Sequence, residues 1–165
     1  ATHVGYMPEN PYDPKYEEVL VACKAIVEKC KENGQNFLFE TGQETPVTLK
    51  RAIQDIEKAV GKGNVGINLD PANLIMYGKA NPVDALEVFG EYVMGIHGKD
   101  GKYPTDGLGD EVPLGQGKVN YSAFIAKLKE IGYQGDITIE REISGEEQKK
   151  DIRMAKELLD KLIAE

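Results

Sequence analysis

The stretch Val65-Gly66-Ile67-Asn68-Leu69-Asp70 is a short apolar run that ends on a carboxylate. The same arrangement occurs three more times, at residues 36–40, 92–97 and 136–140, and each of these runs ends on Glu or His. Short apolar runs bounded by turn residues are typical of buried strands. We therefore predict four strands at these places, and residues 3–7 are a further candidate.

Helical signals separate the predicted strands. A residue with a capping side chain precedes proline, as is typical of a first helical turn, at Asp13-Pro14, Thr45-Pro46 and Asn81-Pro82. Asn120 and the capping-box spacing of Ser144 to Glu147 mark two later helix starts. Helices that alternate with continuously apolar strands predict an α/β fold with a parallel sheet.

Residues 98–119 form the one long irregular segment, with glycine at six positions. Irregular loops of this length inside a compact domain are usually functional. We predict a lid or a ligand-binding loop here.

The length and charge of the chain restrict its partners. It has 165 residues, 28 Asp and Glu against 20 Lys and Arg, and a formal net charge of -8. This length suits one domain, and an acidic chain without a basic patch is not expected to bind nucleic acid. No apolar run approaches the roughly 20 residues that span a bilayer. We expect no membrane partner and a cytoplasmic location.

Each predicted strand ends on a side chain that can bind a divalent cation: Glu40, Asp70, His97 and Glu140. Ligands of parallel α/β folds lie at the carboxyl ends of the strands, so these side chains should converge. Three carboxylates and an imidazole in one crevice need a positive charge between them. This set of oxygen and nitrogen ligands suits Mn²⁺, Mg²⁺, Co²⁺ or Zn²⁺, and we predict one such metal.

Five segments resemble the xylose isomerase-like TIM-barrel superfamily of sugar and sugar-phosphate isomerases and epimerases. They are Phe39-Glu-Thr-Gly-Gln-Glu44, Asn68-Leu-Asp-Pro-Ala-Asn73, Ile96-His-Gly-Lys-Asp-Gly101, Pro113-Leu-Gly-Gln-Gly117 and Thr138-Ile-Glu-Arg-Glu142. Their order and spacing resemble strands five to eight of the barrel, and His3-Val4-Gly5 resembles the end of strand four. The resemblance implies a (β/α) barrel of which about the last four to five βα units are present.

The resemblance also implies roles for the four strand-end residues. They match the ligands of the single catalytic metal in ketose 3-epimerases of this superfamily, where two glutamates exchange a proton beside a metal-polarised carbonyl through an enediolate. We therefore predict a metal-dependent isomerase or epimerase of a sugar or sugar phosphate, with Glu40 and Glu140 as both ligands and acid/base residues. Four further side chains are predicted to bind the substrate: His3, Gln43, Asn73 and Lys99.

Other functions remain open. Asn73 stands where several relatives have His, and the apurinic endonucleases of this fold need more His and Asp ligands for three zinc ions. Because this chain has two histidines, a three-zinc phosphodiesterase is disfavoured. A catalytically silent fragment and a metal-dependent dehydratase or lyase are the alternatives that we keep.

The length is short for a closed barrel, which has eight strands and about 250 residues. We expect residues 1–165 to form one domain that is incomplete at its N-terminus. Three explanations compete: a fragment of a longer enzyme, a half-barrel completed by a homodimer partner, and a rearranged open sandwich. We favour the fragment, with the half-barrel dimer second.

Overall fold

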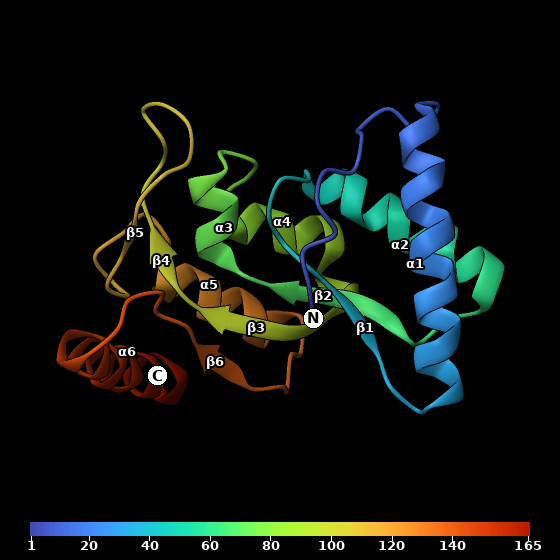
Figure 1. Cartoon of the computed structure of the whole chain (residues 1–165). Helices are drawn as coiled ribbons and strands as arrows, with labels where there is room; N and C mark the ends of the chain where they lie inside the picture. Colours follow the sequence, from blue (N-terminus) through green and yellow to red (C-terminus); the bar gives the residue numbers. More distant parts are fainter.

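A computed structural model describes all residues from 1 to 165. Its centre is a sheet of four parallel strands in the order β1-β2-β3-β6 (Figure 1). The strands are β1 (Phe37–Glu40), β2 (Val65–Leu69), β3 (Val93–Gly98) and β6 (Ile137–Ile139). Strands that follow one another along the chain also lie side by side, as in a (β/α) barrel. The predicted parallel α/β fold is confirmed.

Helices connect the strands. They are α1 (Pro14–Glu32), α2 (Pro46–Val60), α3 (Pro71–Met76), α4 (Pro82–Phe89), the 3-10 turn η1 (Gly90–Tyr92), α5 (Tyr121–Glu130) and α6 (Glu146–Ala164). The predicted caps form, because the side chains of Asp13, Thr45, Asn81 and Asn120 accept hydrogen bonds from first-turn backbone N–H groups. The predicted cap at Ser144 does not form. Instead, α6 begins after Gly145, which has φ 86° and makes no side-chain cap.

The core lies between the sheet and its covering helices. All five residues of β2 are buried, as expected for a central strand with both faces covered. Aromatic rings from three elements fill the core: Phe39 of β1, Phe89 of α4 and Phe124 of α5 are 0% exposed. This packing holds the carboxyl ends of the strands in fixed relative positions.

The sheet does not close on itself. Strands β1 and β6 lie at its two edges, and outside β1 there is a single parallel bridge between Thr2 and Phe39. The prediction of a strand at residues 3–7 is therefore wrong. Gly5 has φ 76°, a left-handed conformation that turns the chain out of an extended path. The four parallel strands lie in one sheet in barrel order, which also rules out the rearranged sandwich.

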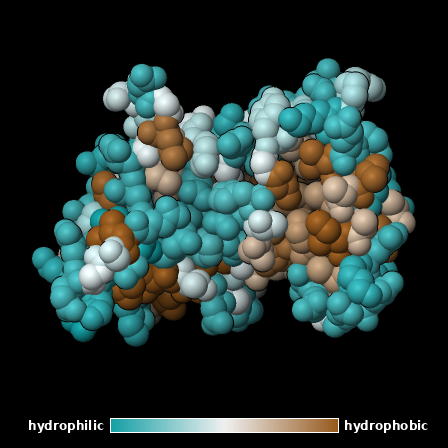
Figure 2. Space-filling view, viewed as in Figure 1, coloured by the Kyte–Doolittle hydropathy of each residue, from teal (hydrophilic) through white to brown (hydrophobic).

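Exposed apolar side chains flank both open ends of the sheet. Val21 and Ile26 lie on α1, beside β1, and Met154 and Ile163 lie on α6, beside β6. Figure 2 shows apolar areas on the α1 side and on the α6 side, separated by a hydrophilic centre. Free edges with apolar flanks are what a partial barrel exposes, because a closed barrel has no edge strands. None of the helices combines the length and the hydropathy that a membrane-spanning helix needs.

The carboxylate of Asp100 anchors the glycine-rich segment 98–119. It contains a short antiparallel ribbon, β4 (Asp100–Gly101) with β5 (Glu111–Val112). The buried carboxylate of Asp100 accepts hydrogen bonds from the backbone N–H groups of Gly101, Gly115, Gly117 and Val119, at 2.8–3.1 Å. A Cβ at position 117 would collide with this carboxylate. The predicted role of the loop as a lid or ligand-binding element stays a prediction.

Candidate metal centre

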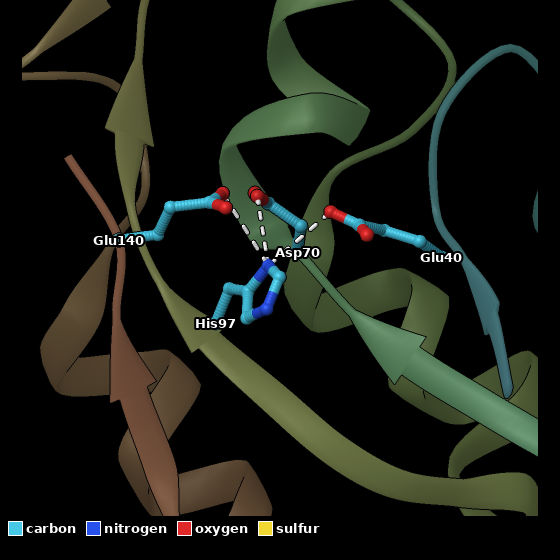
Figure 3. A group of neighbouring side chains, drawn as sticks. All are labelled: Glu40, Asp70, His97 and Glu140. Atoms are coloured by element: carbon cyan, nitrogen blue, oxygen red, sulfur yellow. Dashed lines mark ion pairs between the residues drawn. The ribbon is translucent and has the colours of Figure 1, made fainter. Parts of the chain in front are cut away.

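The four strand-end residues meet at one edge of the sheet (Figure 3). Glu40 is the last residue of β1, Asp70 follows β2, His97 is near the end of β3, and Glu140 follows β6. Their candidate ligand atoms all lie within 4.8 Å of one another. The carboxyl ends of parallel strands share one edge, so residues whose successive members are 27 to 43 positions apart in the chain are brought together.

The three carboxylates surround one ring nitrogen. Nδ1 of His97 lies 3.2 Å from Oε1 of Glu40, 3.4 Å from Oε2 of Glu140 and 3.6 Å from Oδ2 of Asp70. Figure 3 shows Glu40 and Glu140 approaching from opposite sides, with Asp70 between them. Nδ1 therefore faces the same small space as three carboxylate oxygens.

Asp70 provides the test of whether this space suits a cation. Its Oδ1 accepts the backbone N–H of Asn73 at 3.0 Å and so caps α3. Its Oδ2 is buried and has no hydrogen-bond partner, although Nδ1 of His97 at 3.6 Å and Nζ of Lys99 at 3.7 Å face it. A buried carboxylate oxygen without a hydrogen bond is costly unless a positive charge faces it. The residues present therefore fit a divalent cation held by three carboxylates and one imidazole.

Protonation of His97 supplies part of that positive charge in the metal-free protein. The neighbouring carboxylates of Asp70 and then Glu40 raise the pKa of His97 to about 10, against the opposing effect of burial. The same contact with His97 lowers the pKa of Glu40. Because a metal must displace the proton from a histidine ligand, proton and metal compete for this site.

Lys99 is a second, permanent positive charge beside the cluster. Its side chain is 2% exposed, and Nζ lies 2.8 Å from Oε1 of Glu142, 3.1 Å from Oε2 of Glu140 and 3.7 Å from Oδ2 of Asp70. Burial alone lowers the pKa of Lys99, but these carboxylates together raise it above its ordinary value. One ammonium does not neutralise the three carboxylates of the cluster, so the site still favours a cation.

The structure places the four predicted substrate-binding residues differently. Nε2 of His3 lies 3.7 Å from Oε1 of Glu40, and half of its side chain is exposed. Gln43 is exposed on the loop after β1. Asn73 is buried and donates its amide to the carbonyl of Thr41 at 3.0 Å, while Lys99 is engaged by carboxylates. Substrate contact by these residues stays a prediction.

Two buried polar residues were missed by sequence reasoning. The amide nitrogen of Asn68 lies 3.0 Å from Nε2 of His97. Asn68 is a polar residue in an otherwise apolar strand, two positions before Asp70. This pattern could have marked it in the sequence. Glu44 is also buried, its Oε1 has no partner, and burial raises its pKa. Nothing in the local sequence marks Glu44, because only the folded loop buries it.

Comparison with known proteins gives matches over nearly the whole chain. Residues 1–162 match the family described as Xylose isomerase-like TIM barrel. A xylose isomerase domain protein from Planctomyces limnophilus is 39% identical, with a TM-score of 0.86 over 97% of this chain and 56% of that chain. A D-tagatose 3-epimerase-like protein is 26% identical, with a TM-score of 0.68 over 99% of this chain and 61% of that chain.

Of two further matches, one was solved with a bound metal ion, and the other shows how much of a relative's length this chain covers. A xylose isomerase-like TIM barrel protein from Mycobacterium smegmatis, solved in complex with magnesium, has a TM-score of 0.70 at 19% identity, over 97% of this chain and 53% of that chain. An uncharacterized protein from Methanocaldococcus jannaschii is 31% identical over 85% of this chain and 49% of its own length. The chain thus spans about half the length of the curated relatives that it matches.

Proposed function

The chain belongs to the xylose isomerase-like TIM-barrel family, and we propose that it carries the metal centre of an isomerase or epimerase that acts on a sugar or sugar phosphate. The observation that carries the proposal is the convergence of four ligand atoms within 4.8 Å around the unpartnered Oδ2 of Asp70. Sugar epimerases among the solved structures that share this fold support it.

We propose that Glu40 and Glu140 move the proton. A bound divalent metal would polarise a substrate carbonyl and so acidify the neighbouring C–H bond. One carboxylate would remove that proton, and the other would return a proton to the opposite face of the same carbon. The approach of Glu40 and Glu140 from opposite sides of His97 supports this division of roles (Figure 3). Transfer from one face to the other inverts the carbon, which is an epimerisation.

The other residues would hold the site together. Asp70 and His97 would bind the metal without taking part in proton transfer, because Oδ1 of Asp70 already caps α3. Lys99 would keep the carboxylate of Glu140 in place through their 3.1 Å contact. His3, Gln43, Asn73 and Lys99 remain our proposed substrate contacts, and His3 has an exposed side chain beside Glu40. Among Mn²⁺, Mg²⁺, Co²⁺ and Zn²⁺, the magnesium complex of a relative favours Mg²⁺.

We also propose that the active molecule has further strands beside β1 and β6. These strands would come from an N-terminal half of a longer chain or from a second copy of this one. Either source would cover the apolar side chains of α1 and α6 that flank the open edges. The mass of the native particle, measured by light scattering, separates a monomer from a dimer.

Exchange of substrate hydrogen with solvent tests the proposed function. The protein, loaded with Mn²⁺ or Mg²⁺, is incubated in deuterated water with a panel of ketoses and ketose phosphates. We expect deuterium at the carbon next to the carbonyl in both epimers. Glu140→Gln should abolish this exchange without unfolding the protein. Glu146→Gln, an exposed residue of α6, is the matched control and should keep it.

Three results would contradict the proposal. Exchange that persists in Glu140→Gln would remove Glu140 from the mechanism. Loss of water from the substrate would indicate a dehydratase or lyase instead. Absence of deuterium in every ketose with the metal-loaded protein would favour a catalytically silent fragment.

A further inference from the structure

We propose that Thr41 is a positioning residue of the metal centre: its buried side chain fastens the backbone of Asp70 to the end of β1 and so fixes where the carboxylates of Glu40 and Asp70 meet. The proposal rests on the metal centre proposed above and gives a task to a residue outside the ligand set. Three features support it, namely the hydrogen bonds of Thr41, the burial of the groups involved and the place of Glu40 on an edge strand.

The hydroxyl of Thr41 makes two hydrogen bonds to the backbone of Asp70. It donates to the carbonyl of Asp70 at 2.7 Å and accepts the N–H of Asp70 at 2.9 Å. One hydroxyl can fill both roles, because it carries one donor and two acceptor sites. The N–H and the carbonyl of Asp70 are therefore both bound to the same side chain of the neighbouring strand.

These two hydrogen bonds continue the β1–β2 ladder beyond the point where its regular bonds end. The last regular bond joins the N–H of Thr41 to the carbonyl of Asn68 at 3.2 Å. In a continuing parallel ladder, the N–H of Asp70 would bond next to the backbone carbonyl of Thr41. Here the Thr41 hydroxyl accepts that N–H instead. The strand ends thus stay joined while the chain turns into α3 directly after Asp70.

The backbone carbonyl of Thr41 holds the helical side of Asp70. It accepts the side-chain amide of Asn73 at 3.0 Å, and the backbone N–H of Asn73 donates to Oδ1 of Asp70 at 3.0 Å. Thr41 is therefore bound both to the backbone of Asp70 and to the residue that fixes one of its carboxylate oxygens. Because Oδ1 is fixed in this way, the direction of the unpartnered Oδ2 follows from the same contacts.

Burial leaves no replacement for the hydroxyl. Thr41 and Asp70 are 0% exposed, and Asn73 is 4% exposed. Water has no access from which it could take the place of a lost hydroxyl, so two backbone groups of Asp70 would lose a partner. Buried backbone groups without partners are costly, and a shift of the strand ends is the way to relieve that cost.

Glu40 depends on this contact because β1 is an edge strand. The strand has four residues, and on its outer side it makes a single bridge. Strand β2 is therefore its main neighbour, and Thr41 is the residue directly after Glu40. A shift of Thr41 relative to Asp70 would change how the two carboxylates approach Nδ1 of His97, from which they lie 3.2 and 3.6 Å.

Metal affinity and stability, measured on the same variants, test the proposal. Thr41→Val keeps the branched shape of the side chain and loses the hydroxyl, whereas Thr41→Ser keeps the hydroxyl. We expect Thr41→Val to bind Mn²⁺ about 10–100-fold more weakly than wild type, the range typical of lost outer partners of a metal site. Thr41→Ser should recover most of this affinity. Urea unfolding without metal gives the stability of each variant.

Thr48→Val is the matched control. Thr48 is 2% exposed, and its hydroxyl accepts that of Thr45 at 3.1 Å at the start of α2, a hydrogen bond that involves no residue of the cluster. This variant loses a buried hydroxyl of the same kind and should keep wild-type Mn²⁺ affinity, whatever stability it loses. If Thr41→Val is destabilised but binds Mn²⁺ as tightly as wild type, Thr41 only stabilises the fold and the proposal is wrong.

Hydrogen exchange gives a second readout that needs no metal. The amide of Asp70 should exchange slowly in wild type and in Thr41→Ser, and faster in Thr41→Val, while the amide of Ile67 within β2 keeps its protection. Equal exchange of the Asp70 amide in Thr41→Val and wild type would overturn the proposal. Should wild type bind no Mn²⁺, the proposed function fails, and the Asp70 amide still decides whether Thr41 holds the strand end.

Asn73→Ala gives a second route should Thr41→Val not fold. It removes the hydrogen bond to the Thr41 carbonyl and leaves the hydroxyl in place. We expect weaker Mn²⁺ binding than in wild type, with Thr48→Val again as the control. Wild-type affinity in Asn73→Ala would then contradict the proposal.

Discussion

Nζ of Lys99 lies 3.1 Å from Oε2 of Glu140, whereas the nearest cationic groups to Oε1 of Glu40 are the imidazoles of His97, at 3.2 Å, and His3, at 3.7 Å. The two glutamates proposed to exchange a proton therefore have different counter-charges. Glu140 faces an ammonium that stays charged at any physiological pH. Glu40 has only the two rings, and it shares that of His97 with Glu140, which lies 3.4 Å from the same Nδ1.

Removal of the Lys99 ammonium should destabilise the protein and strengthen metal binding. Lys99→Met leaves the carboxylates of Glu140, Glu142 and Asp70 without their shared partner. The cost should be below the roughly 3–5 kcal/mol of a fully buried pair, because the side chain of Glu142 is 63% exposed. The loss of a neighbouring positive charge should also lower the Kd for Mn²⁺. Urea unfolding without metal and Mn²⁺ titration measure the two effects. Lys149 pairs with the exposed Glu146, so the control Lys149→Met should change stability little. A Lys99→Met protein with wild-type stability and wild-type Mn²⁺ affinity would refute the prediction.

The stability of the metal-free protein should fall as pH rises. The pKa of His97 is raised to about 10 by Asp70 and Glu40, above the roughly 6.5 of an unfolded chain. A group whose folded pKa is raised contributes its full stability below the unfolded value and loses it as pH rises through the folded value. The stability difference between wild type and His97→Gln should therefore shrink between about pH 6.5 and 10. Denaturant unfolding across this range checks it, and a constant difference would contradict it.

Two substitutions at Asp70 should separate its structural role from its proposed role as a ligand. Asp70→Asn keeps an oxygen that can cap α3 through the N–H of Asn73, whereas Asp70→Ala loses this cap at a cost of about 1 kcal/mol. Both should weaken Mn²⁺ binding by more than the roughly 10–100-fold of an outer partner. Unfolding and metal titration of the two variants give the comparison. Wild-type affinity in either variant would exclude Asp70 from the ligand set.

Loss of the Asp100 carboxylate should release the glycine-rich loop. Asp100→Ala leaves the N–H groups of Gly115, Gly117 and Val119 without their acceptor, and each costs about 1–3 kcal/mol if it stays buried. The segment 113–119 should therefore open and exchange its amide hydrogens faster, as mass spectrometry would detect. Asp100→Asn keeps one acceptor oxygen and should be intermediate. If the amides of segment 113–119 exchange equally slowly in Asp100→Ala and in wild type, other contacts hold the loop.

Local chemistry made the elements and the four ligand candidates predictable. Prolines after capping residues mark the starts of α1, α2 and α4, and apolar runs mark the strands. The six-residue helix α3 was missed, although Asp70-Pro71 has the same cap-proline signal, because Asp70 was assigned only to a strand end and six residues are too few for an apolar period. The segment 3–7 was wrongly predicted as a strand because Gly5 ends its extended path. Glycine also occurs inside ordinary strands, so the residue type alone did not reveal this.

By itself, the sequence determined the order of strands and helices and singled out Glu40, Asp70, His97 and Glu140 as ligand candidates, because each depends on neighbours within a few positions. Only the tertiary structure decided which residues contact them and the loop. Asn68 contacts the ring of His97, Lys99 pairs with Glu140, and Asp100 accepts hydrogen bonds from the glycine-rich loop. These contacts join residues 15 to 41 positions apart. They depend on strand register and on burial, and a local pattern of residues encodes neither.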